Sequence, residues 1–397
     1  MGETFVTHSR SAENNLAAIW FVIIMVKRDR WDSSSEDEGK PVAKNAISKK
    51  KSKDETSKLK QEEKEIFRSH NPLLQGCRSV YDTYERLARI SEGTYGVVWK
   101  ARDMATNEIV ALKQIKFDSD QQKKQGFPVT ALREIGVLLA LNHECIVTAK
   151  EMVVGSDSDK VFMVMEFMEL DLQEAMKQKR QYPNVLRQGE LKGIMQQILS
   201  GTNHMHSKWF LHRDLKTSNI LVHKTGKVAL CDFGLARRFQ DPPRALTQLV
   251  VTLWYRAPEL LFGENCYGPG IDMWSLGCIF GELICQEAIM QGQGELDQID
   301  KIFQMVGAPT EETWPGFGKL PSAGIFRWKS NQNKILLPEK FPVNAPPHFR
   351  QTFLDGNGYD LLSKMLTLDP KKRISAADAL NHIYFKEGVP PETPCFF

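Results

Sequence analysis

The stretch from His212 to Asn219, His-Arg-Asp-Leu-Lys-Thr-Ser-Asn, holds the residues of this chain with the clearest chemical use. Asp214, Lys216 and Asn219 bring a carboxylate, an amine and an amide close together, and apolar residues flank the stretch. A loop anchored at both ends in a core would aim these three side chains at one point. Phosphoryl transfer needs such a point, because the protein there positions a hydroxyl and neutralises phosphate charge.

A second short string, Asp232-Phe233-Gly234, follows further along the chain. Taken singly, the first string also fits an ordinary charged loop, and the second also fits a turn at the end of a strand. Together they resemble the His-Arg-Asp catalytic loop and the Asp-Phe-Gly metal-binding triplet of protein kinases. This resemblance predicts that the other kinase elements stand in the flanking sequence.

The upstream segment fits a phosphate-binding hairpin. Residues 84–90 alternate, Gly93-Thr94-Tyr95-Gly96 supplies glycines, and Val97-Val98-Trp99 returns as a strand. Glycines let backbone amides close over phosphates without a side-chain clash. Ser91 stands where the kinase pattern has its first glycine, so the loop taken alone fits a plain hairpin turn equally well.

Lys113 ends the apolar run Val110-Ala111-Leu112, where a buried ammonium needs an anionic partner. Glu134 is the expected partner. It lies in Pro128-Val129-Thr130-Ala131-Leu132-Arg133-Glu134, where the proline can start a helix whose apolar face carries Val129, Leu132 and Leu139. The alternative is a lysine that reaches solvent and a glutamate that faces it.

Further segments predict the supports of the site. Residues 161–168 form an apolar strand that runs into a connector, and Leu191–His206 is patterned as a helix. The polar segment Arg237–Thr252 leads to Ala257-Pro258-Glu259, which resembles a kinase activation segment. In that family Glu259 pairs with Arg373, and Asp272, at the start of an apolar helix, holds the backbone of the catalytic loop.

Composition limits the classes of partner and compartment. The chain has 397 residues and a net charge of only +3, so no bulk field favours nucleic acid or membrane as a partner. Its seven cysteines show no Cys-x-x-Cys pair, which favours free thiols in a reducing compartment. We expect a nuclear protein, with cytoplasmic residence left open. Cys231 fits a small core residue or an accessible thiol.

We expect three regions: a mostly disordered extension over residues 1–75, the kinase-like domain over 76–385 that the resemblance implies, and a C-terminal tail over 386–397. Within the tail, Val389–Pro394 should be extended and unstructured. The apolar run 16–26 is too short to span a bilayer. It fits a partner-docking helix or a terminus without function, although a signal sequence or a membrane anchor stays an alternative. Lys49–Lys53 fits either a nuclear-import signal or a solvated linker.

Residues 76–385 resemble protein kinases, and Pro128–Glu134 resembles the cyclin-docking helix of cyclin-dependent kinases. Leu215–Asn219 and Val250–Arg256 look closest to the PITSLRE subfamily, although Pro-Val-Thr-Ala-Leu-Arg-Glu departs partway toward the PITALRE kinases. The resemblance implies an α+β, bilobal fold. A small antiparallel β-sheet lobe with one major helix would cover about residues 80–166, and a mainly helical lobe about 169–385.

The same resemblance implies a cyclin-dependent Ser/Thr kinase that uses ATP and Mg²⁺ and acts in transcription, RNA processing or the cell cycle. Its partners would be a cyclin, with the L type as a candidate, and proteins with Ser/Thr-Pro sites, which Arg256, Val250 and Val251 would select. Asp214 would be the base, Lys216 would steady the phosphoryl group, and Asn219 and Asp232 would hold magnesium. Lys113 and Glu134 would pair, and the ATP site would comprise Ile90, Ser91, Glu92, Gly93, Thr94, Tyr95, Gly96, Val98, Ala111, Lys113, Glu166, Met168 and Leu221.

The resemblance also implies a phosphorylation switch. Thr247 matches the activating phosphosite, and Arg133, Arg213 and Arg237 match the arginines that collect its phosphate. Thr94 and Tyr95 match inhibitory phosphosites, because added charge there would repel ATP. Each of these residues also fits an ordinary surface position. A pseudokinase scaffold is the alternative from another functional class, against which the presence of Lys113, Asp214 and Asp232 argues.

Overall fold

The computed structural model describes residues 78–93, 96–115, 128–155, 161–181, 186–240, 245–246, 252–324, 335–343, 352 and 354–396. By their mutual contacts these residues group into two units. A sheet unit holds the described residues up to Val129 together with Ala149–Glu166, and a helical unit holds Thr130–Thr148 and the chain from Phe167 onward. The predicted α+β class, with an N-terminal sheet followed by a helical region, is confirmed.

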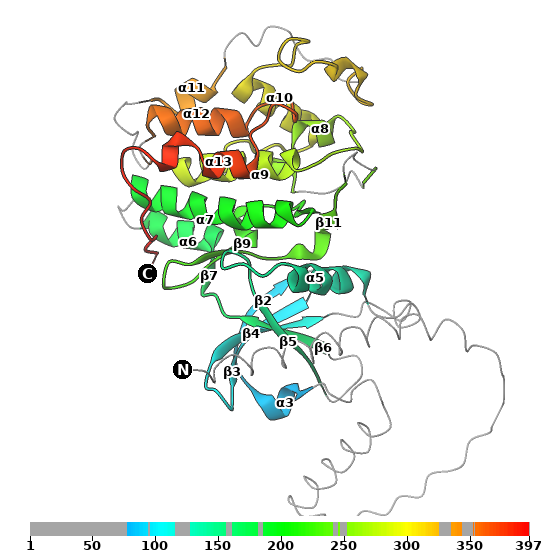
Figure 1. The fold of residues 1–397 in the computed structure, drawn as a ribbon, viewed down its shortest axis with the longest axis vertical. Helices are drawn as coiled ribbons and strands as arrows, with labels where there is room; N and C mark the ends of the chain where they lie inside the picture. The colour runs from blue at the N-terminus through cyan, green and yellow to red at the C-terminus, as the bar shows by residue number, and fades with distance from the viewer. Residues whose placement is uncertain are drawn as a thin grey trace, which may run out of the picture. The chain divides into compact units, whose positions relative to one another are not determined.

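The sheet unit is built on six strands in the order β1-β5-β6-β4-β3-β2 (Figure 1). The strands are β1 (Arg78–Ser79), β2 (Tyr84–Gly93), β3 (Gly96–Asp103), β4 (Ile109–Ile115), β5 (Ala149–Val154) and β6 (Val161–Glu166), and α3 (Val80–Thr83) joins the first two. All pairings are antiparallel except that of β1 with β5. The hairpin predicted around the glycine loop is therefore present as β2 and β3.

Alternation along the strands builds the core of this unit. Val110 and Leu112 of β4 and Phe162 and Val164 of β6 are buried in one cluster, against which Trp99 packs. Because side chains of a strand alternate between faces, Ala111 and Lys113 lie on the opposite face of the sheet. Gly96 is required for a steric reason, since a Cβ there would lie 1.9 Å from the carbonyl oxygen of Gln114.

The helical unit consists mainly of helices with short strands between them. Its helices are α5 (Val129–Ala140), α6 (Leu172–Gln181), α7 (Gln188–Ser207), α8 (Pro258–Leu261), α9 (Gly270–Cys285), α10 (Glu295–Val306), α11 (Leu337–Lys340), α12 (Gly356–Met365) and α13 (Ala376–Leu380). Strands β7 (Leu170–Asp171), β9 (Ile220–Val222) and β10 (Val228–Leu230) form one small sheet, and β8 (Phe210–Leu211) and β11 (Arg237–Arg238) form another. None of the described helices is both long enough and apolar enough to cross a membrane.

Helix α9 is the centre of this unit. It lies between α7 and α12 (Figure 1), and all its residues except the first are buried. A helix that is apolar all round is typically buried in this way. Its two charged residues, Asp272 and Glu282, are buried too, and each binds a segment of the candidate active site described below.

The helix predicted after Pro128 is confirmed as α5, but its buried face differs from the predicted one. Ile135 and Leu138 are buried, whereas Leu139 is 40% exposed. The prediction failed because α5 carries two apolar stripes, and helical periodicity alone does not show which stripe meets the rest of the unit.

The C-terminal tail is also ordered, contrary to the prediction of an unstructured segment. It is extended as predicted, but the amide of Glu392 donates to the carbonyl oxygen of Gly189 in α7 at 2.8 Å, and Phe396 is 8% exposed. The proline-rich composition correctly indicated an extended backbone. It did not show that this segment packs on α7.

The predicted pairing of Glu259 with Arg373 is present and fully buried. The two nitrogens of Arg373 donate to the carboxylate of Glu259 at 2.7 Å and 3.0 Å, a bidentate geometry. Arg373 also donates to the carbonyl oxygens of Thr367, Leu368 and Gly270. The pair thus joins α8, the start of α9 and the segment after α12.

We predict that Glu259→Ala lowers the free energy of unfolding by about 3–5 kcal/mol, because it leaves the Arg373 charge buried without a partner. Chemical denaturation of the purified protein measures this change. The matched control is Glu174→Ala, which removes the exposed pair of Glu174 with Lys177 on α6. The control should cost about 0–1 kcal/mol, and an equal loss in both variants would contradict the prediction.

Candidate active site

The loop that carries Asp214 is held by a buried carboxylate beneath it. Asp272 of α9 accepts hydrogen bonds from the amides of His212 and Arg213, each at 3.0 Å, and from Nε2 of His206 at 2.9 Å. Burial alone would raise the pKa of Asp272, but the bond from His206 and the nearby imidazoles outweigh it and leave the pKa below its ordinary value. The predicted contact of Asp272 with the loop backbone is therefore confirmed.

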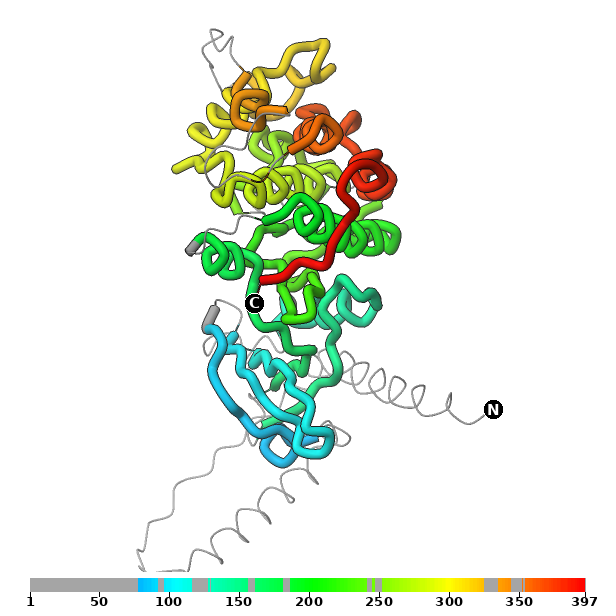
Figure 2. The backbone as a smooth tube through the Cα atoms, turned by 90° about the vertical axis from the view of Figure 1, so that its left-hand side faces the viewer, coloured from blue at the N-terminus to red at the C-terminus, as the bar shows by residue number. Residues whose placement is uncertain are grey.

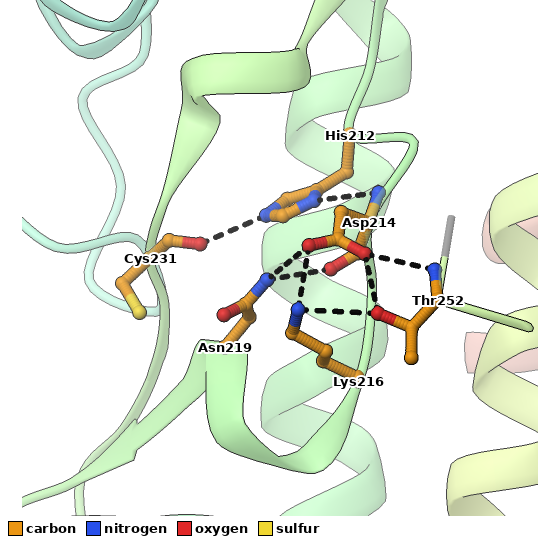
Figure 3. A network of polar contacts seen from close by, with 6 residues as sticks. All are labelled: His212, Asp214, Lys216, Asn219, Cys231 and Thr252. Atoms are coloured by element: carbon orange, nitrogen blue, oxygen red, sulfur yellow. Dashed lines mark hydrogen bonds and ion pairs between the residues drawn. The ribbon is translucent and has the colours of Figure 1, made fainter. Parts of the chain in front are cut away.

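The Asp214 carboxylate accepts four hydrogen bonds (Figure 3). Its Oδ2 accepts from Nζ of Lys216 at 2.8 Å and from Nδ2 of Asn219 at 3.0 Å. Its Oδ1 accepts from the amide of Thr252 at 3.1 Å and from the hydroxyl of Thr252 at 3.0 Å. These donors fix the orientation of a carboxylate that is nearly buried, so the predicted convergence of Asp214, Lys216 and Asn219 is present.

Backbone pairing places Asp232 next to the same loop. Strands β9 and β10 are antiparallel, and beyond them the amide of Cys231 donates to the carbonyl oxygen of Asn219 at 3.0 Å. His212 accepts the amide of Asp214 at Nδ1, so its Nε2 donates to the carbonyl oxygen of Cys231 at 2.9 Å. Cys231 is partly buried, and Asp232 follows it directly.

Asp232 and Arg213 both have left-handed backbone, with φ of 62° and 69°. Such a conformation costs about 1–3 kcal/mol for a non-glycine residue and persists only where the surroundings enforce it. Here two sets of hydrogen bonds hold the backbone in this conformation. The amides of His212 and Arg213 donate to Asp272, and the His212 ring donates to the carbonyl oxygen of Cys231. The strain is located at the two strings that the sequence singled out.

Asn219 and Asp232 have the donor chemistry that magnesium prefers. The Nδ2 of Asn219 is engaged by Asp214, which turns its Oδ1 away from that carboxylate (Figure 3). An amide oxygen and a carboxylate oxygen are hard ligands, and magnesium is usually bound by few protein groups together with phosphate oxygens and water. The described residues include no group of three or more His, Cys, Asp or Glu side chains that could hold a metal ion.

The predicted nucleotide residues of the sheet unit lie in adjacent strands. Ile90, Ser91, Glu92 and Gly93 belong to β2, Gly96 and Val98 to β3, Ala111 and Lys113 to β4, and Glu166 ends β6. Ser91 pairs with Val98 and Val98 pairs with Lys113, so these three residues form a row across the sheet. Lys113 thus lies on the face opposite the core.

Some of the remaining predicted site residues lie in the helical unit, and the others lie outside the residues that the structure describes. Glu134 is buried in α5, Met168 is buried after β6, and Leu221 lies in β9. Lys113 and Glu134 belong to different units, so the ion pair predicted between them stays a prediction. Thr94, Tyr95, Thr247, Val250, Val251 and residues 1–77 lie outside the described residues.

Three arginines gather at the segment that follows Asp232. Arg133 donates to the carbonyl oxygen of Gly234 at 3.2 Å, Arg213 to that of Leu235 at 2.8 Å, and Arg237 to that of Ala236 at 3.1 Å. Arg213 also donates to the hydroxyl of Tyr267 at 2.8 Å. No carboxylate among the described residues pairs with any of the three.

The arginines repel one another. Burial, and then the charges of Arg133 and Arg213, lower the pKa of Arg237 to about 10, and burial with the charge of Arg213 lowers the pKa of Arg133. A pKa lowered by like charges marks a cluster that an anion would stabilise. The arrangement predicted from the sequence for Arg133, Arg213 and Arg237 is therefore present as a cationic cluster.

Sequence reasoning missed two contacts that complete the site. Thr252 bonds to Asp214 and also accepts from Lys216 at 3.2 Å. Glu282 of α9 accepts from the hydroxyls of Tyr255 at 2.7 Å and Thr217 at 3.2 Å, and burial raises its pKa. Thr252 closes the proline-containing segment and Glu282 lies on the apolar helix of Asp272. The positions of Thr252 and Glu282 could have marked them as site residues. Their contacts could not be predicted, because the partners lie far apart in the chain.

Comparison with known proteins agrees with this geometry. The family model described as Protein kinase domain matches residues 84–385. Cyclin-dependent kinase G-1 of Oryza sativa subsp. indica is 50% identical over 324 residues, which cover 82% of this chain and 45% of that protein. Cyclin-dependent kinase 11B of Homo sapiens is 46% identical over 326 residues, covering 82% and 39%. Serine/threonine-protein kinase ppk23 of Schizosaccharomyces pombe is 48% identical over 328 residues, covering 83% and 78%.

The chain belongs to the protein kinase family, as the sequence predicted. Within that family it is a homologue of cyclin-dependent kinases, and the predicted resemblance to the PITSLRE group is confirmed. The chain spans less than half the length of the cyclin-dependent kinases G-1 and 11B that it matches.

We predict that Thr252→Val lowers kcat for peptide phosphorylation about 10- to 100-fold, because the loss of a hydrogen bond to a charged group is worth about 1.5–3 kcal/mol. The Asp214 carboxylate would lose one donor and Lys216 one acceptor. Thr252→Ser keeps the hydroxyl and serves as the control. Steady-state kinetics with a single peptide measure both variants, and equal rates for Val and Ser would show that the hydroxyl does not position Asp214.

Proposed function

We propose that this chain is a cyclin-dependent Ser/Thr kinase that transfers the γ-phosphoryl group of ATP to Ser or Thr residues followed by proline. The observation that carries this proposal is the Asp214 carboxylate, which Lys216, Asn219 and Thr252 hold in one orientation. A general base must first be held within reach of the proton that it accepts, and only then does its own pKa affect the rate. The position of Asp232, two residues after the end of β10 and beside this loop, supports a metal site next to Asp214.

The chain's own residues divide the work of the reaction. Asp214 accepts the proton of the substrate hydroxyl, and Lys216, bonded to Asp214, steadies the moving phosphoryl group. Asn219 Oδ1 and the Asp232 carboxylate would hold Mg²⁺, which when bound neutralises phosphate charge. The row of Ser91, Val98 and Lys113 would line the nucleotide site, with the backbone of the glycine loop over the phosphates.

Helix α5 is the proposed docking surface for a cyclin. Its Leu139 is 40% exposed, and Leu132 is only partly buried, so one apolar stripe of the helix stays available. The match of Pro128–Glu134 to the cyclin-docking helix and the printed names of the relatives support the same partner. An L-type cyclin is the candidate that the PITSLRE resemblance favours.

The cationic cluster of Arg133, Arg213 and Arg237 supports an activating phosphate on Thr247. A phosphothreonine carries a charge of about −1.5 to −2 and three acceptor oxygens. Bound by the cluster, it would offset the burial and the like charges of Arg133 and Arg213 that together lower the pKa of Arg237. Since Arg133 lies on α5, such a phosphate would link the activation segment to the proposed cyclin helix. Phosphates on Thr94 and Tyr95 would act oppositely, by repelling ATP.

Specificity, process and compartment are also proposed. Arg256 pairs with Glu295 at 2.6 Å and belongs to the segment that would select proline after the phosphoacceptor. The PITSLRE resemblance and the lysine-rich stretch 49–53 favour a nuclear enzyme of transcription, RNA processing or cell-cycle control.

We predict that the chain purified with its bound cyclin phosphorylates Ser-Pro peptides and prefers them to matched Ser-Ala peptides. Asp214→Asn should lower the rate about 100-fold or more, because it removes the base. The variant should still bind nucleotide and still copurify with the cyclin, which separates chemistry from assembly. A chain that binds cyclin yet leaves every peptide unmodified would instead be a scaffold.

We predict that Thr247→Ala lowers the activity of the cyclin complex at least tenfold while ATP affinity is unchanged, because the phosphate orders the segment and does not touch the nucleotide. Phosphopeptide mass spectrometry and kinetics measure the two quantities. In a double-mutant cycle, Arg237→Ala should abolish the effect of Thr247→Ala, whereas the exposed Arg180→Ala on α6 should leave it intact. Undiminished activity of Thr247→Ala would refute the switch.

A further inference from the structure

The C-terminal tail lies in a track formed by three glycines of the helical unit. Figure 2 shows the tail, in red, running across the green helices of that unit. A Cβ on Gly193 would lie 1.9 Å from the carbonyl oxygen of Glu392, and one on Gly189 would lie 2.7 Å from the Glu392 side chain. A Cβ on Gly226 would lie 2.3 Å from the methyl carbon of Thr393. The tail therefore occupies space that a Cβ at any of the three positions would enter, and at Gly193 the nearest tail atoms are those of the backbone.

Gly226, the third of these glycines, is held next to α7 by hydrogen bonds. Gly226 lies in the turn between β9 and β10 with φ of +83°. Gln197 of α7 donates to its carbonyl oxygen at 3.2 Å and accepts the amide of Val228 at 2.8 Å. The turn and the helix thus form one continuous surface beneath residues 392–394, and we name this surface, Gly189, Gly193 and Gly226, the glycine track.

Specific bonds hold the tail on both sides of Thr393. The amide of Glu392 donates to Gly189 at 2.8 Å, and the amide of Cys395 donates to the buried Glu190 carboxylate at 3.1 Å. Pro394 is buried, and Phe396 is buried with Nζ of Lys179 at 5.5 Å from its ring. Thr393 itself is exposed. An exposed hydroxyl therefore sits in a stretch of backbone that is fixed before and after it.

We propose that Thr393 is a masked phosphorylation site for a proline-directed Ser/Thr kinase, and that release of the tail from the glycine track unmasks it. Thr393 is followed directly by Pro394, the pair that such kinases select. A kinase takes its substrate as an extended segment and contacts the proline, but here Pro394 is buried and the amides of Glu392 and Cys395 are bonded. Docked, the tail cannot enter another active site.

The step itself is an ordinary phosphoryl transfer. The Thr393 hydroxyl oxygen forms a bond to the γ-phosphorus of ATP, the bond from that phosphorus to the bridging oxygen breaks, and ADP leaves. The hydroxyl proton passes to the base of the modifying kinase. The modifying enzyme is supplied separately, so the proposal does not depend on the activity proposed above for this chain.

The test uses the full chain with Asp214→Asn, so that any phosphate comes from an added, purified proline-directed kinase with ATP and Mg²⁺. Gly193→Ala is the releasing variant, because the three atoms nearest to a Cβ there are all backbone atoms of Glu392 and because alanine favours a helix. Gly136→Ala in α5 is the matched control, since a Cβ there meets nothing within 4 Å. Mass spectrometry follows phosphate on Thr393, and hydrogen exchange follows the amides of Glu392 and Cys395.

We expect Gly193→Ala to speed exchange of both amides and to raise the rate of Thr393 phosphorylation at least tenfold, while Gly136→Ala matches the parent. A free peptide of residues 386–397 should be modified at the rate of the released tail, and Thr393→Val should abolish the signal. A parent tail modified as fast as the peptide would overturn the masking. Faster exchange in Gly193→Ala without faster phosphorylation would overturn the site, and unchanged exchange would overturn the role of the glycine track.

Discussion

The hydrogen bonds that Asp272 accepts from the loop above it hold the candidate active site together. A buried carboxylate without donors would be costly, because burial penalises its charged form. Two of its donors are the amides of His212 and Arg213. These amides face the Asp272 carboxylate only while Arg213 keeps its left-handed backbone. The ionised Asp272 and the strained loop therefore stabilise each other. The orientation of Asp214 depends on α9 as much as on its own loop.

Charge is distributed unequally around that anchor. The carboxylate of Asp272 accepts three hydrogen bonds and that of Asp214 accepts four. Among the described residues, by contrast, Arg133, Arg213 and Arg237 donate only to carbonyl oxygens and a tyrosine hydroxyl. Hydrogen bonds to neutral acceptors satisfy the donors without cancelling the charge. The two carboxylates thus have several donors each, whereas no described carboxylate balances the charge of the three arginines. An anion supplied from outside the described residues would remove this imbalance.

Local sequence predicted the contacts that short motifs encode and missed those that depend on long-range packing. The bond of Asp272 to the loop and the Glu259–Arg373 pair followed from family motifs, and the helix at Leu191–His206 followed from periodicity and is part of α7. The buried face of α5 did not follow, because two apolar stripes have the same period. The position of Thr252 at the end of the proline-containing segment was a signal, but its bond to Asp214 did not follow from it, since the two residues lie far apart in the chain.

The tail shows why a domain boundary taken from sequence similarity need not be a boundary of the folded unit. The family match ends at residue 385, yet backbone bonds continue to Cys395. Glycine in a helix costs about 1 kcal/mol relative to alanine, and α7 contains Gly189, Gly193 and Gly201. A Cβ on Gly201 would lie 2.7 Å from the carbonyl oxygen of Cys145, and the other two would meet the tail. Each glycine thus admits a neighbouring segment of chain, so α7 accommodates the tail in the same way that it accommodates an internal segment of the kinase domain.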